Sequence, residues 1–396
     1  MPSLFTRSFL LLTAAQLLQA LGYASMILLP LYRDFLGADR AQVGMIMAVS
    51  AVGGLSARPA IAWGLDRWGR KPTLVVGTFI VVSCFVALGA VDSLGPLVYG
   101  IRLVMGIGLA ALFTGYFTLA SDLVPPSRRA EGLALFGIAG LIPLVVNPLA
   151  GRIGFAASEL RWFFPIVGVG ILCSLILLAA VEAPPLVGAR TPLVWRDVLR
   201  ALRARPLWPV WFATGVFAAL VSVFMSFTTI VAESRGLVDP AVAWFSYAGG
   251  AVMVRALGAS LPERVGLSRI LAPALAAYVM AMGMVAIADT TGGFLAAGAL
   301  AGFGHGYCFP VLTAQTVSRS PEALRGTALS LYTALWDLAK LAVVPAMGLL
   351  ADWRGDETML WTCCAFGAAG GFFWAFLEWR TVIPDTTDNR SSDALP

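Results

Sequence analysis

This sequence has few charged residues. Aspartate, glutamate, lysine and arginine together make up 12% of its 396 residues, and a single histidine is present. Ordinary soluble domains carry roughly 25% charged residues, so this chain has too little polar surface to face water on all sides. Hydrophobic residues reach 59% and the mean hydropathy is +0.84. The composition predicts a protein whose solvent is the lipid bilayer.

Sequence motifs for catalysis and cofactors are missing as well. One histidine cannot form a metal cluster, the five cysteines lack C-x-x-C spacing, and neither a P-loop nor a G-x-S-x-G elbow is found. The net charge of +5 is not gathered into a basic patch, so nucleic acid is not an expected partner. We therefore expect no enzyme activity, no cofactor and no metal site.

Long apolar runs are what the sequence has instead. A bilayer core takes about 20 apolar residues per helix, and twelve such runs are found, near 8–31, 42–64, 73–91, 97–120, 133–154, 163–182, 207–231, 241–261, 270–288, 293–317, 326–349 and 358–379. The expected fold is an all-α membrane protein of twelve transmembrane helices in two pseudo-symmetric six-helix bundles. The expected domains are an N-terminal bundle over 1–182, a cytoplasmic linker over 183–206, a C-terminal bundle over 207–380 and a cytoplasmic tail over 381–396.

The basic residues between these runs predict the orientation. Cytoplasmic loops of membrane proteins are enriched in lysine and arginine. With the N-terminus inside, the inner segments hold 17 basic residues and the outer loops hold 6. We therefore expect both termini and the linker to be cytoplasmic.

The two halves of the sequence repeat each other at an offset of 197 residues. Arg58 recurs as Arg255, Asp66 as Glu263 and Gly69 as Gly266, and Arg128 and Pro148 recur as Arg325 and Pro345. Matches at one offset in several separate places indicate a duplicated six-helix unit. Many secondary transporters are built from two such repeats with a site near the bilayer midplane.

The segment from Ala62 to Lys71 resembles the loop motif between helices 2 and 3 of the major facilitator superfamily. The pattern G-x-x-x-D-R-x-G-R-[RK] is matched except that Ala62 replaces the first glycine. The stretch from Arg102 to Ala111 is similar to the helix 4 motif of the same superfamily, and the region around Gly304 resembles the bacterial arabinose-efflux-permease-like branch. The antiporter motif of helix 5 is degraded here, with Pro143 and Asn147 in its place, which weakens an inference of antiport.

This resemblance implies a cytoplasmic gating motif and a set of roles for the helices. Helices 1, 4, 7 and 10 are expected to line the cavity, and helices 3, 6, 9 and 12 to face lipid. The gating residues that we expect from the resemblance and the repeat are Asp66, Arg67, Gly69, Arg70, Lys71, Asp122, Glu263, Arg264, Arg58 and Arg255.

Ionisable residues within apolar spans are costly and are therefore functional candidates. Asp337 and Lys340 lie one helical turn apart, within reach of each other. They predict a pair that couples transport to protons; a fixed ion pair, and a Lys340 that binds a substrate anion, are the alternatives. His305 predicts either a proton relay or a polar link to a neighbouring helix. For Arg102, the resemblance implies an effect on the proton site or on a conformation.

The polar and aromatic residues of the expected cavity helices are weaker candidates. A mainly apolar cavity with scattered polar groups suits lipophilic or amphipathic cargo. The candidates are Gln16, Gln19, Tyr23, Tyr116, Ser222, Phe224, Met225, Phe227 and Thr228.

Together these features predict a monomeric, proton-coupled secondary transporter of a bacterial inner membrane. It is expected to export small lipophilic or amphipathic molecules by alternating access, with a small-molecule substrate, protons and the bilayer as its partners. One alternative is uptake or exchange of a small organic anion bound by Lys340 and Arg102. The other is a non-transporting scaffold or sensor on the same fold.

Overall fold

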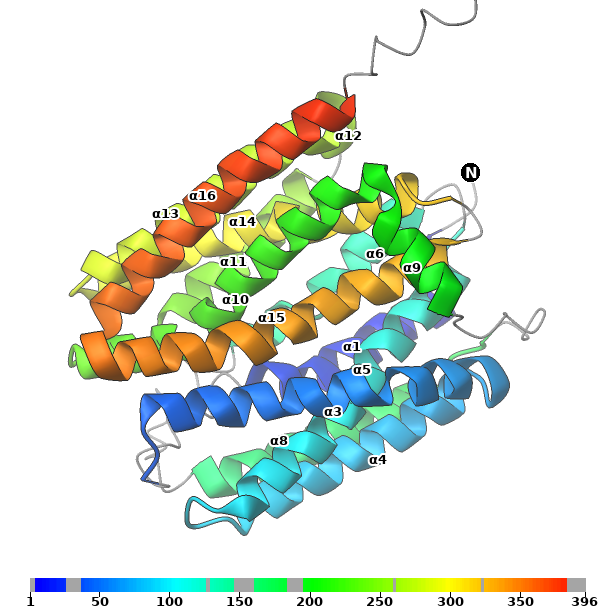
Figure 1. Ribbon diagram of the computed structural model, residues 1–396. Coiled ribbons are helices and arrows are strands. Elements are labelled where there is room, and N and C mark those ends of the chain that lie inside the picture. The colour runs from blue at the N-terminus through cyan, green and yellow to red at the C-terminus, as the bar shows by residue number, and fades with distance from the viewer. Residues whose placement is uncertain are drawn as a thin grey trace, which may run out of the picture.

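The computed structural model describes residues 4–25, 37–125, 129–145, 160–183, 195–258, 261–321 and 324–382, and within these ranges all regular structure is helical (Figure 1). Nine of the described helices are long and apolar enough to cross a membrane. They are α3 (Arg40–Arg67), α4 (Arg70–Gly89), α5 (Pro96–Leu123), α8 (Leu160–Ala179), α10 (Trp208–Ser234), α13 (Leu267–Ile287), α14 (Thr291–Ser318), α15 (Arg325–Arg354) and α16 (Asp356–Val382). The prediction of an all-helical membrane fold is confirmed for the described residues.

Shorter helices occupy the remaining expected spans. They are α1 (Arg7–Ser25), α6 (Arg129–Ile138) with the 3-10 turn η3 (Ile142–Val145), and α11 (Ala243–Leu257). The linker contains α9 (Trp195–Arg203) and η5 (Arg205–Leu207), and α12 (Leu261–Val265) precedes α13. Parts of the first, fifth and eighth expected spans lie outside the described residues, so the count of twelve stays a prediction.

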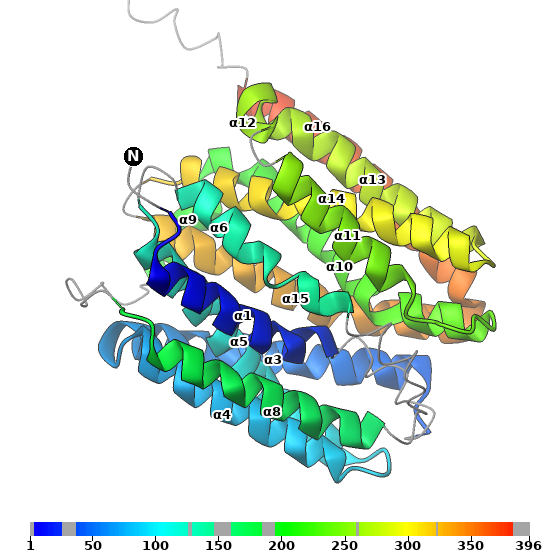
Figure 2. The ribbon, with the colours of Figure 1, turned by 180° about the vertical axis from the view of Figure 1, so that it is seen from behind.

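The packing of the later helices repeats that of the earlier ones. In the first half α3 and α4 pack on α5, and α8 packs on α4 and α1. In the second half α11 and α13 pack on α14, and α16 packs on α13 and α10. In Figures 1 and 2 the pairs α4–α8 and α13–α16 lie at opposite edges of the molecule. The 197-residue offset of the sequence is thus matched by equivalent helix contacts.

The two halves meet mainly along α3 and α15, which run side by side (Figure 1). At one end the Arg40 side chain pairs with Asp356 at 2.7 Å, and the Asp352 carboxylate accepts the Ala41 amide at 2.7 Å. One turn along, a Cβ at Gly44 would lie 2.9 Å from the Pro345 backbone. Small residues permit this close approach of two helices in a membrane. A second contact joins α6 and η3 to α11.

The outer helices expose large apolar side chains. On α8 and α16 these include Trp162, Ile166, Val169, Ile176, Phe366, Phe372, Phe373 and Phe376. Contiguous apolar surface of this kind is unfavourable in water, so these faces are suited to contact lipid chains. By contrast, 94% of the residues in an 18-residue apolar segment of α10 are buried inside the protein.

Two glycines form equivalent turns at equivalent places. Gly69 between α3 and α4 has φ 102°, and Gly266 between α12 and α13 has φ 107°. Side chains other than glycine rarely adopt this backbone conformation. The glycines therefore fix both turns, and their common φ is a backbone counterpart of the sequence repeat.

Alanine at Gly69 is expected to destabilise the protein by roughly 1–3 kcal/mol, because a Cβ strains a backbone with positive φ. The apparent melting midpoint of the purified protein in detergent should fall by roughly 2 °C or more. Gly100→Ala is the matched control, since this helical glycine has open space around its Cβ position. Equal midpoints for the two variants would contradict the role assigned to the turn.

Candidate functional site

An ion pair joins the two halves at the middle of the α3–α15 contact. The Arg58 guanidinium pairs with the Asp337 carboxylate and also donates to the Thr333 hydroxyl at 2.7 Å. Arg58 and Asp337 keep about a fifth of their side-chain surface exposed. A position enclosed between two helices strengthens such a pair relative to one in water. The pair therefore links the relative position of α3 and α15 to the charge on Asp337.

Asp337 does not pair with Lys340, although the two residues are neighbours on α15. Among the described residues the ion-pair partner of Asp337 is Arg58, and Lys340 makes no hydrogen bond or ion pair. Helical spacing places the two side chains within reach, but the arginine presents a planar fork that matches a carboxylate better than an ammonium does. Asp337 therefore makes its ion pair between helices, with Arg58, while Lys340 stays close enough to interact electrostatically with its carboxylate.

His305 is buried and hydrogen-bonded to a neighbouring helix. Its Nδ1 atom bonds the Tyr247 hydroxyl of α11, and its ring packs edge-on against Phe217 at 5.5 Å between centroids. Trp336 of α15 lies 6.2 Å from the same ring. This geometry corresponds to the polar link between helices, one of the two alternatives that the sequence left open.

Arg102 is buried in α5 and faces α3. Its Nε atom donates to the Ile46 carbonyl at 3.2 Å, and its terminal nitrogen lies 3.1 Å from the Met105 sulfur. Arg102 is 2% exposed. The residue therefore ties α5 to α3 within the first half of the chain.

Arg255, the repeat counterpart of Arg58, has a different environment. Its guanidinium carbon lies 5.8 Å above the centroid of the Phe309 ring. Its Nε atom is buried without a hydrogen-bond partner, and no ion pair to Arg255 is present among the described residues. Arg58 thus contacts an acid of the other half, and the gating role of Arg255 stays a prediction.

Part of the expected cytoplasmic motif is organised around the α4 N-terminus. The Arg70 Nε atom pairs with Asp122 of α5 at 2.9 Å, and Arg70 also donates to the Leu65 carbonyl. Lys71 donates to the carbonyls of Ala179 and Val181 beyond α8. These contacts tie the α3–α4 turn to α5 and α8.

Two other members of the motif lie at the surface. Arg67 and Arg264 are exposed. The side chains of Asp66 and Glu263 lie outside the described part of the structure. The position of these two acids therefore stays a prediction.

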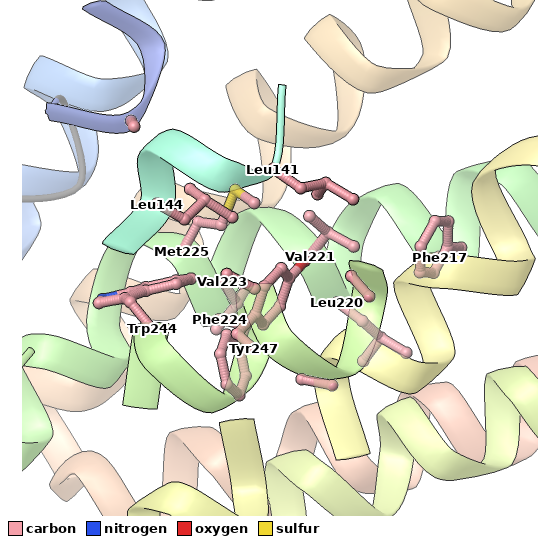
Figure 3. Close-up of a cluster of buried hydrophobic side chains, with 14 of the residues drawn as sticks. Leu141, Leu144, Phe217, Leu220, Val221, Val223, Phe224, Met225, Trp244 and Tyr247 are labelled. Atoms are coloured by element: carbon pink, nitrogen blue, oxygen red, sulfur yellow. The ribbon is translucent and has the colours of Figure 1, made fainter. Parts of the chain in front are cut away.

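The expected cavity residues are closely packed. Gln16, Gln19, Tyr116, Ser222, Phe224, Met225, Phe227 and Thr228 are all buried, and the side chain of Tyr23 is outside the described residues. Phe224 packs against Trp244 and Tyr247 at 5.7 and 5.8 Å between ring centroids. Figure 3 shows Met225 beside Leu144 of η3. At Met225, α10 therefore lies against η3.

A polar network at one end of the second half contains residues that the sequence does not predict as a site. The Glu378 carboxylate of α16 accepts two hydrogen bonds from Arg319 of α14, at 2.5 and 2.8 Å, and one from Ser268 of α13 at 2.5 Å. Gln315 also donates to Ser268, at 3.0 Å. In the sequence, the feature that could have indicated this network is Glu378, an acid near the end of the apolar run 358–379. Its partners lie on two other helices, and linear spacing does not reveal them.

Relatives place these features in a known family. The family model described as Major Facilitator Superfamily matches residues 11–344. An uncharacterised MFS-type transporter of Salmonella typhimurium is 25% identical over 367 residues, which cover 87% of this chain and 90% of that protein. The multidrug resistance protein MdtL of Klebsiella pneumoniae is 29% identical over 149 residues, which cover 37% of this chain and 38% of that protein.

The fold is also similar to solved transporter structures. A POT family transporter, solved in complex with 5-aminolevulinic acid, has a TM-score of 0.80 at 12% identity, over 95% of this chain and 97% of that one. At that identity the likeness concerns the fold alone. The match of the family model over most of the sequence, together with this fold, shows that the chain belongs to the Major Facilitator Superfamily.

Proposed function

We propose that this transporter couples proton movement to the export of small lipophilic or amphipathic molecules. Two six-helix halves, with twelve spans in all, would rock about the α3–α15 contact so that a central site opens to each side in turn. In this proposal the protein acts as a monomer in a bacterial inner membrane, with both termini in the cytoplasm.

The Arg58–Asp337 pair carries the proposal. It connects helices of the two halves, so any change in its strength acts on their relative position. Protonation would remove the negative charge of Asp337 and weaken its attraction to Arg58. Proton binding and release at Asp337 would then favour different arrangements of the halves.

Two further observations support the direction and the cargo. The Klebsiella pneumoniae protein MdtL, which matches this chain over 149 residues, is named for multidrug resistance. The expected cavity helices supply mostly apolar and aromatic side chains, with a few amides and hydroxyls such as those of Gln16 and Thr228. Such a lining binds amphipathic molecules without requiring a fixed pattern of hydrogen bonds.

The organic-anion alternative gains support from Lys340, which has no ion-pair partner among the described residues. Arg102 fits it less well, because its Nε atom is bonded to the Ile46 carbonyl. The scaffold alternative leaves unexplained why an ion pair at membrane depth should link the two halves.

Asp337→Asn is expected to abolish accumulation driven by a pH gradient, because asparagine cannot take up and release a proton. In proteoliposomes, uptake of a cationic or neutral lipophilic dye should fall on the order of tenfold or more. Substrate counterflow without a gradient should persist. Asp289→Asn is the matched control, since this carboxylate is 81% exposed.

Two results would separate the readings of Asp337. Gradient-driven flux that survives in Asp337→Asn would refute its role in coupling. Loss of counterflow together with driven flux would instead indicate a fixed structural pair.

A disulfide across one end of the α3–α15 contact is expected to stop transport, because rocking requires the helix ends to separate. A Cβ at Gly348 would lie 3.2 Å from the Ala41 Cα, which is within reach of a disulfide. It would also lie 2.7 Å from the Arg40 carbonyl, so the two helices must move apart slightly to accept this cysteine. In a chain whose five cysteines are replaced, Ala41→Cys with Gly348→Cys should lose flux in proportion to the cross-linked fraction and regain it on reduction. The two single variants are the controls, and full activity of the cross-linked protein would contradict alternating access at this contact.

A further inference from the structure

Arg255 is a buried cation for which the described residues provide no counter-ion. The residue is 6% exposed, and its Nε atom is enclosed without a hydrogen-bond partner. No carboxylate pairs with it among the described residues; its close contact is the Phe309 ring. A buried charge is strongly disfavoured unless it is paired. The position therefore calls for a negative charge that the described chain does not supply.

The sequence repeat indicates which residue of the first half corresponds to Asp337. Arg58 pairs with Asp337 of α15. Shifted by the repeat offset, Arg58 corresponds to Arg255 and Asp337 corresponds to Gly140. The position equivalent to Asp337 is therefore a glycine, and the Arg255 guanidinium lies against Gly137, three residues before it.

The chain at Gly140 is broken as a helix. After α6 ends at Ile138, the amides of Gly140 and Leu141 bond the carbonyls three residues earlier, at 3.2 and 2.9 Å. Irregular backbone at membrane depth is tolerated where it is enclosed by protein or lines a site. In transporters, interrupted helices commonly form the substrate site.

Polar groups from both halves reach this turn. A Cβ at Gly137 would lie 2.5 Å from a terminal nitrogen of Arg255, and a Cβ at Gly140 would lie 3.8 Å from the Gln16 amide nitrogen. The Gln16 Oε1 atom is buried without a hydrogen-bond partner. A guanidinium and an amide therefore approach the turn at its two glycines, which carry no side chain.

Flat rings lie beside this turn. Phe309, which packs under Arg255, has Tyr332 and Trp336 of α15 at 5.9 and 5.8 Å between centroids. Phe117 of α5 reaches the same ring from the first half at 6.4 Å. Rings in this arrangement can stack with an aromatic ligand.

We propose that Arg255 and Gln16 bind the anionic group of the cargo at the α6 turn, and that the cargo is an aromatic monocarboxylate. The carboxylate pairs with Arg255, for which the described residues provide no acid, and the ring of the cargo packs among Phe309, Tyr332 and Trp336. This inference rests on the proposed transport function and narrows its substrate class from amphipathic molecules in general to aromatic anions. It assigns the anion to Arg255 in place of Lys340 and Arg102.

Binding is tested on the purified full chain by isothermal titration calorimetry with three probes of one shape: benzoate, benzamide and benzylamine. Benzoate should bind at least about tenfold more tightly than the other two, because it alone supplies a negative charge, whereas benzamide is neutral and benzylamine is a cation. Arg255→Gln should weaken benzoate binding about 30-fold or more, and Arg255→Lys by less. Arg269→Gln, at an exposed position, should leave it unchanged. Loss that follows Lys340→Gln or Arg102→Gln, with Arg255→Gln unaffected, would overturn the assignment.

A second variant places an acid at Gly140, the position equivalent to Asp337. A Cβ at Gly140 meets no atom closer than 3.5 Å, so Gly140→Asp can be accommodated and should pair with Arg255. Benzoate binding should then be lost while the melting midpoint is kept or raised, and Gly140→Asp combined with Arg255→Gln should lower the midpoint. Undiminished benzoate binding in Gly140→Asp would overturn the inference.

The two proposals fail in different ways. Benzoate that binds but is not moved by a pH gradient would contradict proton-coupled transport and leave the binding site standing. Gradient-driven flux of a neutral or cationic lipophile, with no benzoate binding, would overturn the anion site and leave proton coupling standing.

Discussion

A charged side chain at membrane depth is costly to bury unless it pairs with another charge or a backbone carbonyl, and this constraint organises much of the interior of the protein. Arg58 and Asp337 meet across the two halves, and Arg102 finds a backbone carbonyl of the neighbouring helix. Arg319 and Glu378 join α14 to α16. Each contact joins two helices that apolar packing alone would leave free to slide, because lipid chains are as apolar as the side chains they would replace. Buried polar pairs of this kind set the register of one helix against the next.

Glycine has the complementary role, since it lets backbones approach closely enough for those contacts to form. A Cβ at Gly53 would collide with the Leu103 carbonyl of α5, and a Cβ at its repeat counterpart Gly250 would lie 2.7 Å from the Ala299 carbonyl of α14. The two halves therefore build the same close crossing from the same residue type. Any larger residue at Gly53 or Gly250 would collide with the backbone of the neighbouring helix, which explains why glycine is found at both positions.

Much of the fold could be predicted from the sequence. Hydrophobic length located the helices to within a few residues, because a span needs a minimum number of apolar residues whatever it packs against. The repeat offset anticipated the equivalent turns at Gly69 and Gly266. Broken helices are harder: the segment after Ile138 is as apolar as its neighbours, and its 3-10 winding depends on what surrounds it.

Less of the candidate site could be predicted. The sequence identified Asp337 as an exceptional charge but assigned it the neighbour that helical spacing offered, Lys340. The observed partner, Arg58, is 279 positions away in the chain. Only the packing of α3 on α15 brings these two together. Likewise, the repeat singled out Arg255 and Arg58 as a pair, yet their different surroundings depend on which helix each one faces.

The enclosure of α10 has a consequence for how the membrane acts on the protein. Its most apolar window is 94% buried, and it carries hydroxyl side chains at Thr214, Ser222, Ser226, Thr228 and Thr229. Because protein surrounds it, α10 does not sense bilayer thickness directly. A thinner or thicker bilayer is met first by lipid-exposed helices such as α8 and α16, which can tilt to match it. Mechanical stress from the lipids would therefore reach α10 only through the helices that pack against it.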